Sequence, residues 1–398
     1  MIHLLQKTSI RFLLTAVVFA TVSSLSGSSS PQAVATSPAQ SQEFQEVAPG
    51  IEHLQLKRGG TSSGESKGPW LINLLRVDLS KVDIRVVHAL DEGVGLETVS
   101  SMAARYKATA ATNGGYFRTT GTFRGDSIGT LMLNGKLISE PNNARASVGF
   151  IKQRDTLQLV FGHLKFLADI SLRGRRHGVD GVNRPPAANE VIIFTPEFHS
   201  TTLTIPQGAE AIVRNGRVTR VRDAHGSSEI PADGYVISAV GNGRDWLTRN
   251  LRRGTPVALS WRLIALDVKQ EALWRNAQTI LGGGPQLIRG GEVSITNEQE
   301  KILPSFVTDL HPRTAIARLA SGKALLVTVD GRQPGVSVGI SLNELAKLLL
   351  EFGAVEAINL DGGGSTAMVV LGKLVNRPSD QSGERPVSDA VLVLTRAN

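Results

Sequence analysis

The chain has 398 residues and a net charge of +8, with 41% hydrophobic and 20% charged residues. This is a globular composition, and the absence of cysteine excludes disulfides, thiolate metal sites and a thiol nucleophile. No run of Lys and Arg is interleaved with aromatic residues, so we expect no nucleic-acid partner. The charge is compatible with a solvated basic surface or with a preference for anionic ligands.

The N-terminus has the pattern of a secretory signal peptide. Basic residues precede an apolar stretch at 12–22, and small residues follow, with Ala33-Val34-Ala35 as a cleavage site and Ser26 as the alternative. We expect residues 1–35 to be removed on export to a periplasmic or extracellular location. An uncleaved membrane anchor is the alternative, although the apolar stretch is short for a bilayer span.

The rest of the chain divides into a tether and one domain. Residues 36–45 are rich in Ser, Gln and Pro, a composition that predicts a disordered tether. Residues 46–398 contain no second linker and are predicted to form one domain.

The first predicted helix of this domain spans 98–107 and leads into a strand at 108–112. The strand is followed by Asn113, two glycines, Tyr116 and Phe117. The same order of helix, strand, Asn or Asp, and Gly-Gly returns near the C-terminus. It predicts that Asn113 and Asp361 end equivalent strands and face one site, with coincidence between two glycine turns as the alternative.

Hairpins recur along the domain. Two-residue turns containing glycine separate apolar runs, and such turns favour tight antiparallel hairpins. The segments are 131–139, 211–221, 286–295 and 369–376. A triple glycine at 281–288 is interpreted as a tight bend closed by Pro285.

A longer hairpin is predicted across 311–332. With Ser321-Gly322 as a two-residue turn, Arg313 lies directly opposite Asp330. The pair is either a structural salt bridge or a device in which Arg313 grips a phosphate or carboxylate through two hydrogen bonds. His311 is either a packing or capping residue or a catalytic one.

The clearest helix spans 341–353, because Ser341 and Glu344 form a capping box and Gly353 follows its apolar stripe. A strand at 354–360 then delivers Asp361 to a loop of three glycines, and another strand follows. The segment lacks the helix of a dinucleotide fingerprint, the lysine of a P-loop and the final glycine of a nucleophile elbow. We therefore predict an anion-binding nest of backbone N–H groups with Asp361 beside it as an acid or base.

The last core strand is predicted within 384–394. Taken together, these elements predict an α+β fold with a β-rich mixed sheet core, many hairpins and a few covering helices.

Five motifs in order, ATNGGYF, GGGPQLI, HPRTAIA, VDGR and NLDGGGS, resemble the phosphodiester glycosidase family, across roughly residues 70–398. The resemblance implies hydrolysis of a sugar-1-phosphodiester to the sugar and a phosphomonoester. It implies catalytic roles for Asn113, Arg313, Asp330 and Asp361. The implied substrate contacts are Tyr116, His311, Gly362, Gly363, Gly364, Ser365 and Thr366. Ala317 departs from the glycine common at this position.

The chemistry fits these residue types. Cleavage of an anomeric C–O bond needs a carboxylate pair, or one carboxylate and an activated leaving group. A phosphate leaving group needs charge stabilisation more than protonation, which Arg313 and loop N–H groups could supply. We predict an exported hydrolase acting on a sugar-phosphate or related envelope or extracellular glycan, without a cofactor and with metal dependence open. A non-catalytic polysaccharide-binding module is the alternative.

Overall fold

The computed structural model describes residues 43–60, 67–154 and 156–396. The predicted signal peptide and residues 36–42 of the predicted tether lie outside this range. The described residues form one compact unit. Among the described residues, no helix combines the length and apolar character needed to cross a bilayer.

The largest sheet is built from both ends of the chain. Its strands are β1 (Gln45–Ala48), β2 (Ile51–Arg58), β3 (Trp70–Val77), β20 (Gln286–Arg289), β21 (Glu292–Val293), β22 (Arg313–Leu319), β23 (Ala324–Val329) and β24 (Ala354–Asn359). They lie in the order β1-β2-β3-β23-β22-β24-β20-β21, and their pairings are antiparallel. Helix α5 (Leu342–Glu351) covers one face with an apolar stripe that includes Leu345, Leu348 and Leu349.

A second, five-stranded antiparallel sheet has the order β26-β25-β5-β27-β4. Its strands are β4 (Val82–His88), β5 (Ala110–Asn113), β25 (Met368–Val370), β26 (Lys373–Leu374) and β27 (Asp389–Thr395). Helix α1 (Val99–Arg105) packs on it through Val99 and Met102, which are fully buried. The 3-10 turns η2 (Ala89–Asp91) and η4 (Gly363–Ser365) flank its strands.

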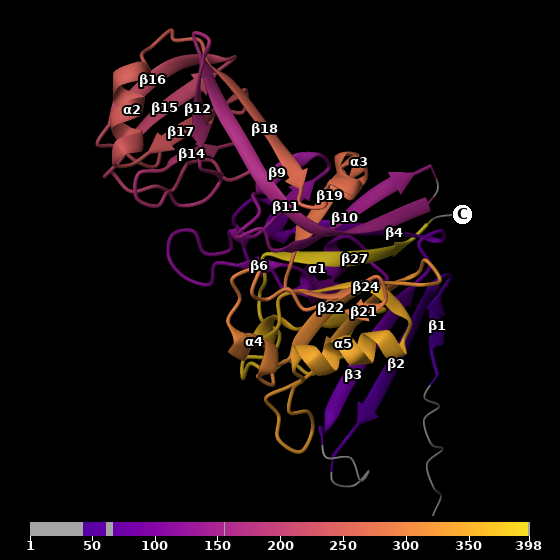
Figure 1. The fold of residues 1–398 in the computed structure, drawn as a ribbon. Helices are drawn as coiled ribbons and strands as arrows, with labels where there is room; N and C mark the ends of the chain where they lie inside the picture. The colour runs from indigo at the N-terminus through magenta and orange to yellow at the C-terminus, as the bar shows by residue number, and fades with distance from the viewer. Residues whose placement is uncertain (1–42, 61–66, 155, 397–398) are drawn as a thin grey trace, which may run out of the picture. The chain divides into compact units, whose positions relative to one another are not determined.

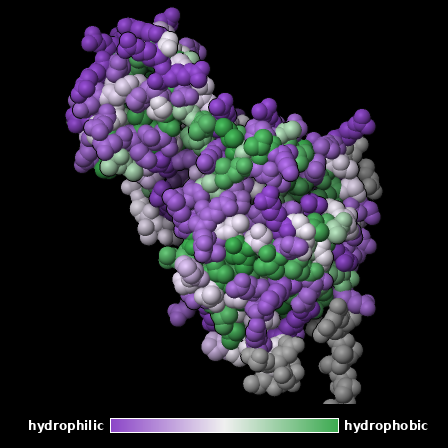
Figure 2. Space-filling model, viewed as in Figure 1, coloured by the Kyte–Doolittle hydropathy of each residue, from purple (hydrophilic) through white to green (hydrophobic). Residues whose placement is uncertain are grey.

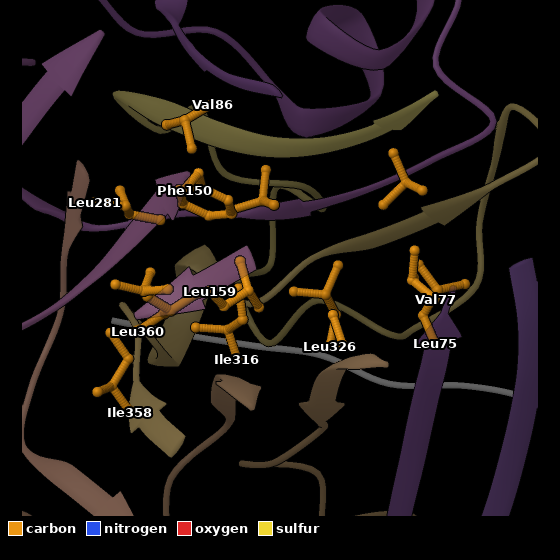
Figure 3. Close-up of a cluster of buried hydrophobic side chains, with 14 of the residues drawn as sticks. Leu75, Val77, Val86, Phe150, Leu159, Leu281, Ile316, Leu326, Ile358 and Leu360 are labelled. Atoms are coloured by element: carbon orange, nitrogen blue, oxygen red, sulfur yellow. The ribbon is translucent and has the colours of Figure 1, made fainter. Parts of the chain in front are cut away.

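The main core lies where these two sheets meet a third. Figure 3 shows Leu75, Ile316 and Leu326 of the eight-stranded sheet pointing toward the strands that carry Val86 and Phe150. Because each of these side chains comes from a different strand, the core joins segments that are far apart in the sequence.

The third sheet has seven strands, β12-β11-β10-β19-β8-β9 with β18 paired to β11. They are β8 (Leu131–Leu133), β9 (Lys136–Ser139), β10 (Ala146–Gln153), β11 (Thr156–Leu172), β12 (Arg175–Val179), β18 (Ala258–Ala265) and β19 (Thr279–Gly282). The first half of the long strand β11 pairs with β10, and its second half pairs with β18 and β12 (Figure 1).

A further five-stranded sheet, β13-β14-β17-β15-β16, packs on the second half of β11. Its strands are β13 (Gly181–Val182), β14 (Val191–Phe194), β15 (Ala209–Arg214), β16 (Arg217–Asp223) and β17 (Gly234–Ala239), with α2 (Asn242–Asn250) beside them. The face of this region seen in Figure 2 is mostly hydrophilic. The remaining elements are β6 (Tyr116–Phe117), β7 (Ser127–Ile128), η3 (Val268–Gln270), α3 (Glu271–Asn276) and α4 (Pro304–Thr308).

The structure confirms the predicted β-rich α+β fold. The four short hairpins form as β8–β9, β15–β16, β20–β21 and β25–β26. Both turn residues have positive φ in each, as at Asn134 (52°) and Gly135 (79°), which is the geometry of type I′ turns. The predicted helices form as α1 and α5, and Ser341 Oγ accepts the N–H of Glu344 at 3.2 Å.

The register predicted for the 311–332 hairpin is wrong by one residue. Arg313 pairs with Val329, and Arg318 pairs with Ala324. The turn has one residue more than expected, because the N–H of Leu319 bonds the carbonyl of Lys323 and Gly322 takes a positive φ of 83°. A slip of one residue moves side chains to opposite faces of a sheet, so Arg313 and Asp330 do not face each other.

Candidate active site

The glycine loop lies where strand β24 of the large sheet passes into strand β25 of the five-stranded sheet. Asp361 follows β24, and η4 (Gly363–Ser365) forms the turn. The loop rests on the chain before β22: the N–H of Gly363 donates to the carbonyl of Pro312 at 2.9 Å. A β-carbon on Gly362 would lie 2.6 Å from that oxygen, so this position requires glycine.

The predicted nest of free N–H groups is not formed by most of the loop. The N–H of Gly362 donates to Asp361 Oδ1 at 2.9 Å, and that of Gly363 is used by Pro312. Ser365 and Thr366 donate to the carbonyls of Gly362 and Gly363. Because these donors are already engaged, anion binding here must rely mainly on side chains.

Asp361 is half-buried, and burial raises the pKa of its carboxyl to about 6. The nearby Ser365 hydroxyl, the Gly362 N–H and the positive charge of Arg385 oppose this rise. The Ser365 hydroxyl is buried and makes no hydrogen bond within the described residues, whereas the Gly362 N–H donates to Asp361 Oδ1 at 2.9 Å. A carboxyl that titrates near neutral pH can serve as an acid, a base or a nucleophile.

Asn113 lies beside Asp361, as the repeated order of elements predicts. Its side chain is buried and donates to the Asp361 carbonyl at 2.7 Å. Its Oδ1 accepts from Thr314 Oγ1 at 2.8 Å and from the N–H of Ala367 at 3.2 Å. All of these bonds are internal, so Asn113 holds the glycine loop to β5 and β22.

The Gly114-Gly115 turn after Asn113 is held in a comparable way. Asp389 is buried, and its Oδ1 accepts the N–H of Gly115 at 2.6 Å. A β-carbon on Gly114 would lie 2.0 Å from the same oxygen. The Asp389 carboxylate therefore occupies the space that a side chain on Gly114 would need, and it fixes the turn that leads to Tyr116.

Tyr116 is half-buried and reaches the other triple glycine. Its hydroxyl donates to the carbonyl of Gly284 at 2.8 Å and accepts from Asn359 Nδ2 at 2.7 Å. Burial, reinforced by the charge of Asp361, raises the pKa of the phenol, so Tyr116 is neutral. The Arg145 guanidinium carbon lies 5.4 Å from the ring centroid. The predicted tight bend at 281–288 is thus part of the site.

Arg313 is almost fully buried and makes no ion pair with Asp330. Its guanidinium donates to the backbone carbonyls of Ile340, Phe306 and Asp309 at 3.2, 2.6 and 3.0 Å. Its Cζ lies 4.6 Å from the Phe306 ring centroid. Burial lowers its pKa to about 10. These contacts favour a role in positioning the chain around Pro312.

Asp330 follows the neighbouring strand β23 and is fully buried. Its Oδ1 accepts from Asn376 Nδ2 at 3.1 Å and its Oδ2 from the N–H of Arg377 at 2.8 Å. Burial raises its pKa to about 6. Since Asn376 also binds the Thr366 carbonyl and the Met368 N–H, Asp330 supports the glycine loop from behind.

Two arginines beside the loop were missed as site residues. A β-carbon on Gly363 would lie 3.1 Å from Nη2 of Arg332, and one on Gly364 would lie 2.2 Å from Nη2 of Arg385. Arg385 forms two hydrogen bonds with Asp380, at 2.7 and 3.0 Å. Arg332 is exposed, and none of the described residues gives it a carboxylate partner. The VDGR motif was the available signal in the sequence.

His311 is half-buried next to this group. Burial lowers its pKa, and the charges of Arg313 and Arg332 lower it further. Its ring is therefore neutral near pH 7. The structure thus places Tyr116 and Arg385 within electrostatic reach of the Asp361 carboxyl. Arg332 lies beside Gly363, and His311 lies within electrostatic reach of Arg332.

The described residues contain no group of three or more His, Cys, Asp or Glu side chains placed to hold a metal ion. A cavity of about 890 Å³ lies elsewhere, lined by residues such as His88, Asp91 and His199 and by none from the glycine loop. The geometry of the carboxylate and the guanidinium groups, not cavity size, identifies the candidate site.

Residues 207–394 match the model of the phosphodiester glycosidase family. The matched segment, just under half of the chain, is therefore similar to this family. The match covers the second triple glycine and the motifs around Arg313, Arg332 and Asp361, whereas Asn113 and Tyr116 lie before it.

A curated relative is N-acetylglucosamine-1-phosphodiester alpha-N-acetylglucosaminidase of Mus musculus. It is 30% identical over 207 residues, which cover 48% of this chain and 38% of that protein. The matched segments span between 20% and 38% of the length of this and two other mammalian relatives.

Two solved structures share the fold. A hypothetical protein from Synechocystis matches with a TM-score of 0.76 and 24% identity over 90% of this chain and 64% of its own. A protein from Burkholderia pseudomallei, described as a candidate exported protein, matches with a TM-score of 0.72 and 27% identity over 83% and 75% of the two chains.

Proposed function

We propose that the chain is an exported hydrolase that cleaves the bond between a sugar C1 and the oxygen of a phosphodiester in an envelope or extracellular glycan. The match to the family model and the reaction named for the mammalian relatives support this class of reaction. One structural observation is the main support for the proposal. Asp361 has a raised pKa and lies in the same loop as Gly363, against which the exposed Arg332 guanidinium rests without a carboxylate partner among the described residues.

In the proposed reaction the C1–O bond breaks and its electron pair leaves with the phosphate oxygen. Water supplies a hydroxyl group to C1 and loses a proton. The leaving phosphomonoester is a weak base, so no strong acid is needed on its side. Asp361 acts in its ionised form, either by taking the proton from water or by adding to C1 before water replaces it.

Arg332 is proposed to bind the phosphate, because a guanidinium group can donate two parallel hydrogen bonds to phosphate oxygens. Arg385 adds positive charge, partly balanced by Asp380. Asn113, Asp330 and Arg313 position the loop through their buried contacts. The half-buried Tyr116 and His311 are proposed to contact the sugar. Ser365 and Thr366 are buried and are proposed to support the loop behind them.

The test is turnover of defined diesters. Purified chain is incubated with methyl and 4-nitrophenyl diesters of N-acetylglucosamine 1-phosphate, and free sugar is measured with and without chelator. We expect release by wild type and by Asp233→Asn, whose side chain is 44% exposed, and none by Asp361→Asn. A folded Asp361→Asn variant with wild-type turnover would reject the assignment. Binding of polysaccharide without turnover by wild type would favour the binding-module alternative.

Export is tested separately. Protein secreted by the native host is sequenced from its N-terminus, and we expect a start between about residues 27 and 36, by the cleavage logic of signal peptides. A mature chain that still begins at Met1 in the cytosol would contradict export without affecting the reaction.

A further inference from the structure

A cavity of about 750 Å³ borders the candidate site, which is within the usual size range for ligand pockets. Its walls come from the β6–β7 region, the loop after β9, the middle of β11 and the start of the further five-stranded sheet. The charged residues of the lining are Arg118, Glu140, Lys165, Asp180, Arg184 and Lys301.

The cavity adjoins the surroundings of Tyr116 at three points. Ile128 pairs directly with Tyr116 across β6 and β7. Ala144 lines the cavity and precedes Arg145, whose guanidinium lies over the Tyr116 ring. Lys301 follows Glu300, whose Oε2 would lie 2.2 Å from a β-carbon on Gly284. Gly284 in turn accepts the Tyr116 hydroxyl. The cavity therefore lies next to residues that contact Tyr116 and Gly284.

The charged groups of the lining are not equally available. Glu140 is bound by Arg184 at 2.5 Å and by the N–H of Val182 at 2.9 Å. Asp180 accepts the N–H of Val191 at 2.8 Å. Arg184 is further bound by Glu190. Arg184 therefore pairs with two carboxylates, and a backbone N–H occupies one oxygen of Asp180.

The two lysines of the lining differ from these groups. Lys165 and Lys301 are exposed, come from distant parts of the sequence, and have no ion-pair partner among the described residues. Arg118 is paired with the buried Asp126 at 3.1 Å. The cavity therefore offers two uncompensated ammonium groups, together with the neutral amides of Asn142 and Asn143.

We propose that this cavity binds an acidic glycan segment of the substrate, one that carries carboxylate or phosphate groups along a sugar chain. The inference rests on the proposed function, which places the scissile bond at Asp361. It adds the chemical class of the substrate segment that extends away from that bond. Lys165 and Lys301 contact the anionic groups, and the amides and the half-buried ring of Phe166 contact the sugar rings. The two carboxylates in the wall disfavour a strand with a phosphate at every residue, so a nucleic acid fits less well.

The test is binding, measured by titration calorimetry on the whole chain at 50 and 500 mM salt. The probes are a galacturonic acid hexamer, neutral maltohexaose and the oligonucleotide dT6. We compare Lys165→Gln/Lys301→Gln with Lys57→Gln/Lys373→Gln. The second pair is a matched control, because Lys57 and Lys373 are exposed, lie outside this cavity and carry the same charge.

We expect the hexamer to bind wild type and the control variant equally. Binding should weaken about tenfold or more in the cavity variant and weaken with salt, because charge contacts near the surface are screened. Unchanged binding in the cavity variant, an equal loss in the control, or no binding of the hexamer to wild type would overturn the proposal. Binding of dT6 with the same lysine dependence would overturn the choice of a glycan.

These outcomes are independent of catalysis, since Asp361→Asn is expected to bind the hexamer as wild type does. Lysine-dependent binding of the hexamer without turnover of any diester would reject the proposed reaction and support the acidic-glycan site. Turnover of the methyl diester without lysine-dependent binding would support the proposed reaction and reject the acidic-glycan site.

Discussion

Replacing Asp361 with asparagine should make the protein more stable at neutral pH while abolishing turnover. Burial raises the pKa of this carboxyl from 3.8 to about 6, so the folded protein holds the proton more tightly than the unfolded chain does. The favourable contribution of the protonated group is fully present below pH 3.8 and is lost as the pH rises through 6. At neutral pH the folded state therefore bears the cost of an ionised, half-buried carboxylate.

The size of this cost follows from the pKa. The rise corresponds to about 3 kcal/mol at 1.36 kcal/mol per pKa unit. Because the side chain is only half-buried, solvent screening reduces the figure to roughly 1–3 kcal/mol. Asparagine keeps an oxygen for the Gly362 N–H, which now donates to Oδ1 at 2.9 Å, so the variant removes the charge without losing this bond.

The free energy of unfolding is measured by urea denaturation at pH 7.5 and pH 4 for wild type, Asp361→Asn and the exposed control Asp233→Asn. We expect Asp361→Asn to exceed wild type by about 1–3 kcal/mol at pH 7.5, and the difference to shrink toward zero at pH 4. The control should stay within about 0.5 kcal/mol of wild type. A variant that is less stable at pH 7.5, or a gain that does not depend on pH, would refute the reasoning.

Three further predictions concern the same site. Gly362→Ala should destabilise the protein by about 1–3 kcal/mol and lower kcat, because the new β-carbon would press on the Pro312 carbonyl. Gly178→Ala is the control, since a β-carbon there meets open space, and it should change neither stability nor kcat. Equal effects of the two substitutions would contradict the steric explanation. Arg332→Lys should lower kcat/KM for phosphodiesters by about tenfold or more, since lysine loses the planar fork, and leave the urea midpoint unchanged; a kcat/KM equal to wild type would exclude phosphate binding by Arg332. The kcat/KM of wild type should rise with pH through about 6, the pKa of Asp361, and a profile that falls over this range would instead make this carboxyl the acid.

Local turn and cap signals in the sequence were sufficient to predict most of the elements. Asn-Gly and Gly-Gly pairs force positive φ at both turn positions, so hairpins such as β8–β9 form where expected. Ser341 caps α5 through a single local hydrogen bond. Such signals depend on neighbours within four residues, which a sequence displays directly.

The register of the 311–332 hairpin needed information that the turn residues do not carry. Ser321-Gly322 can close a two-residue turn or end a longer one with Gly322 at positive φ, and the structure takes the longer one. The choice is made by packing, because this register places Arg313 among the carbonyls of Ile340, Phe306 and Asp309. Arg332 was missed for a related reason. Its position beside Gly363 arises from the meeting of two loops that are far apart in the sequence.

The difference between the buried and the exposed polar groups of the site indicates where its chemistry lies. Asn113, Asp330 and Asp389 are buried, and hydrogen bonds to backbone or side-chain groups occupy their side chains. An unsatisfied buried polar group costs about 1–3 kcal/mol, so these residues stabilise the loop geometry only while their partners stay in place. Asp361 and Arg332 remain able to bind a substrate. The Asp361 carboxyl has a pKa of about 6, and the Arg332 guanidinium has no carboxylate partner among the described residues. In the proposed reaction, a phosphodiester would bring a phosphate to Arg332 and a sugar carbon to Asp361, whereas a neutral glycoside would leave the guanidinium of Arg332 without an anionic partner.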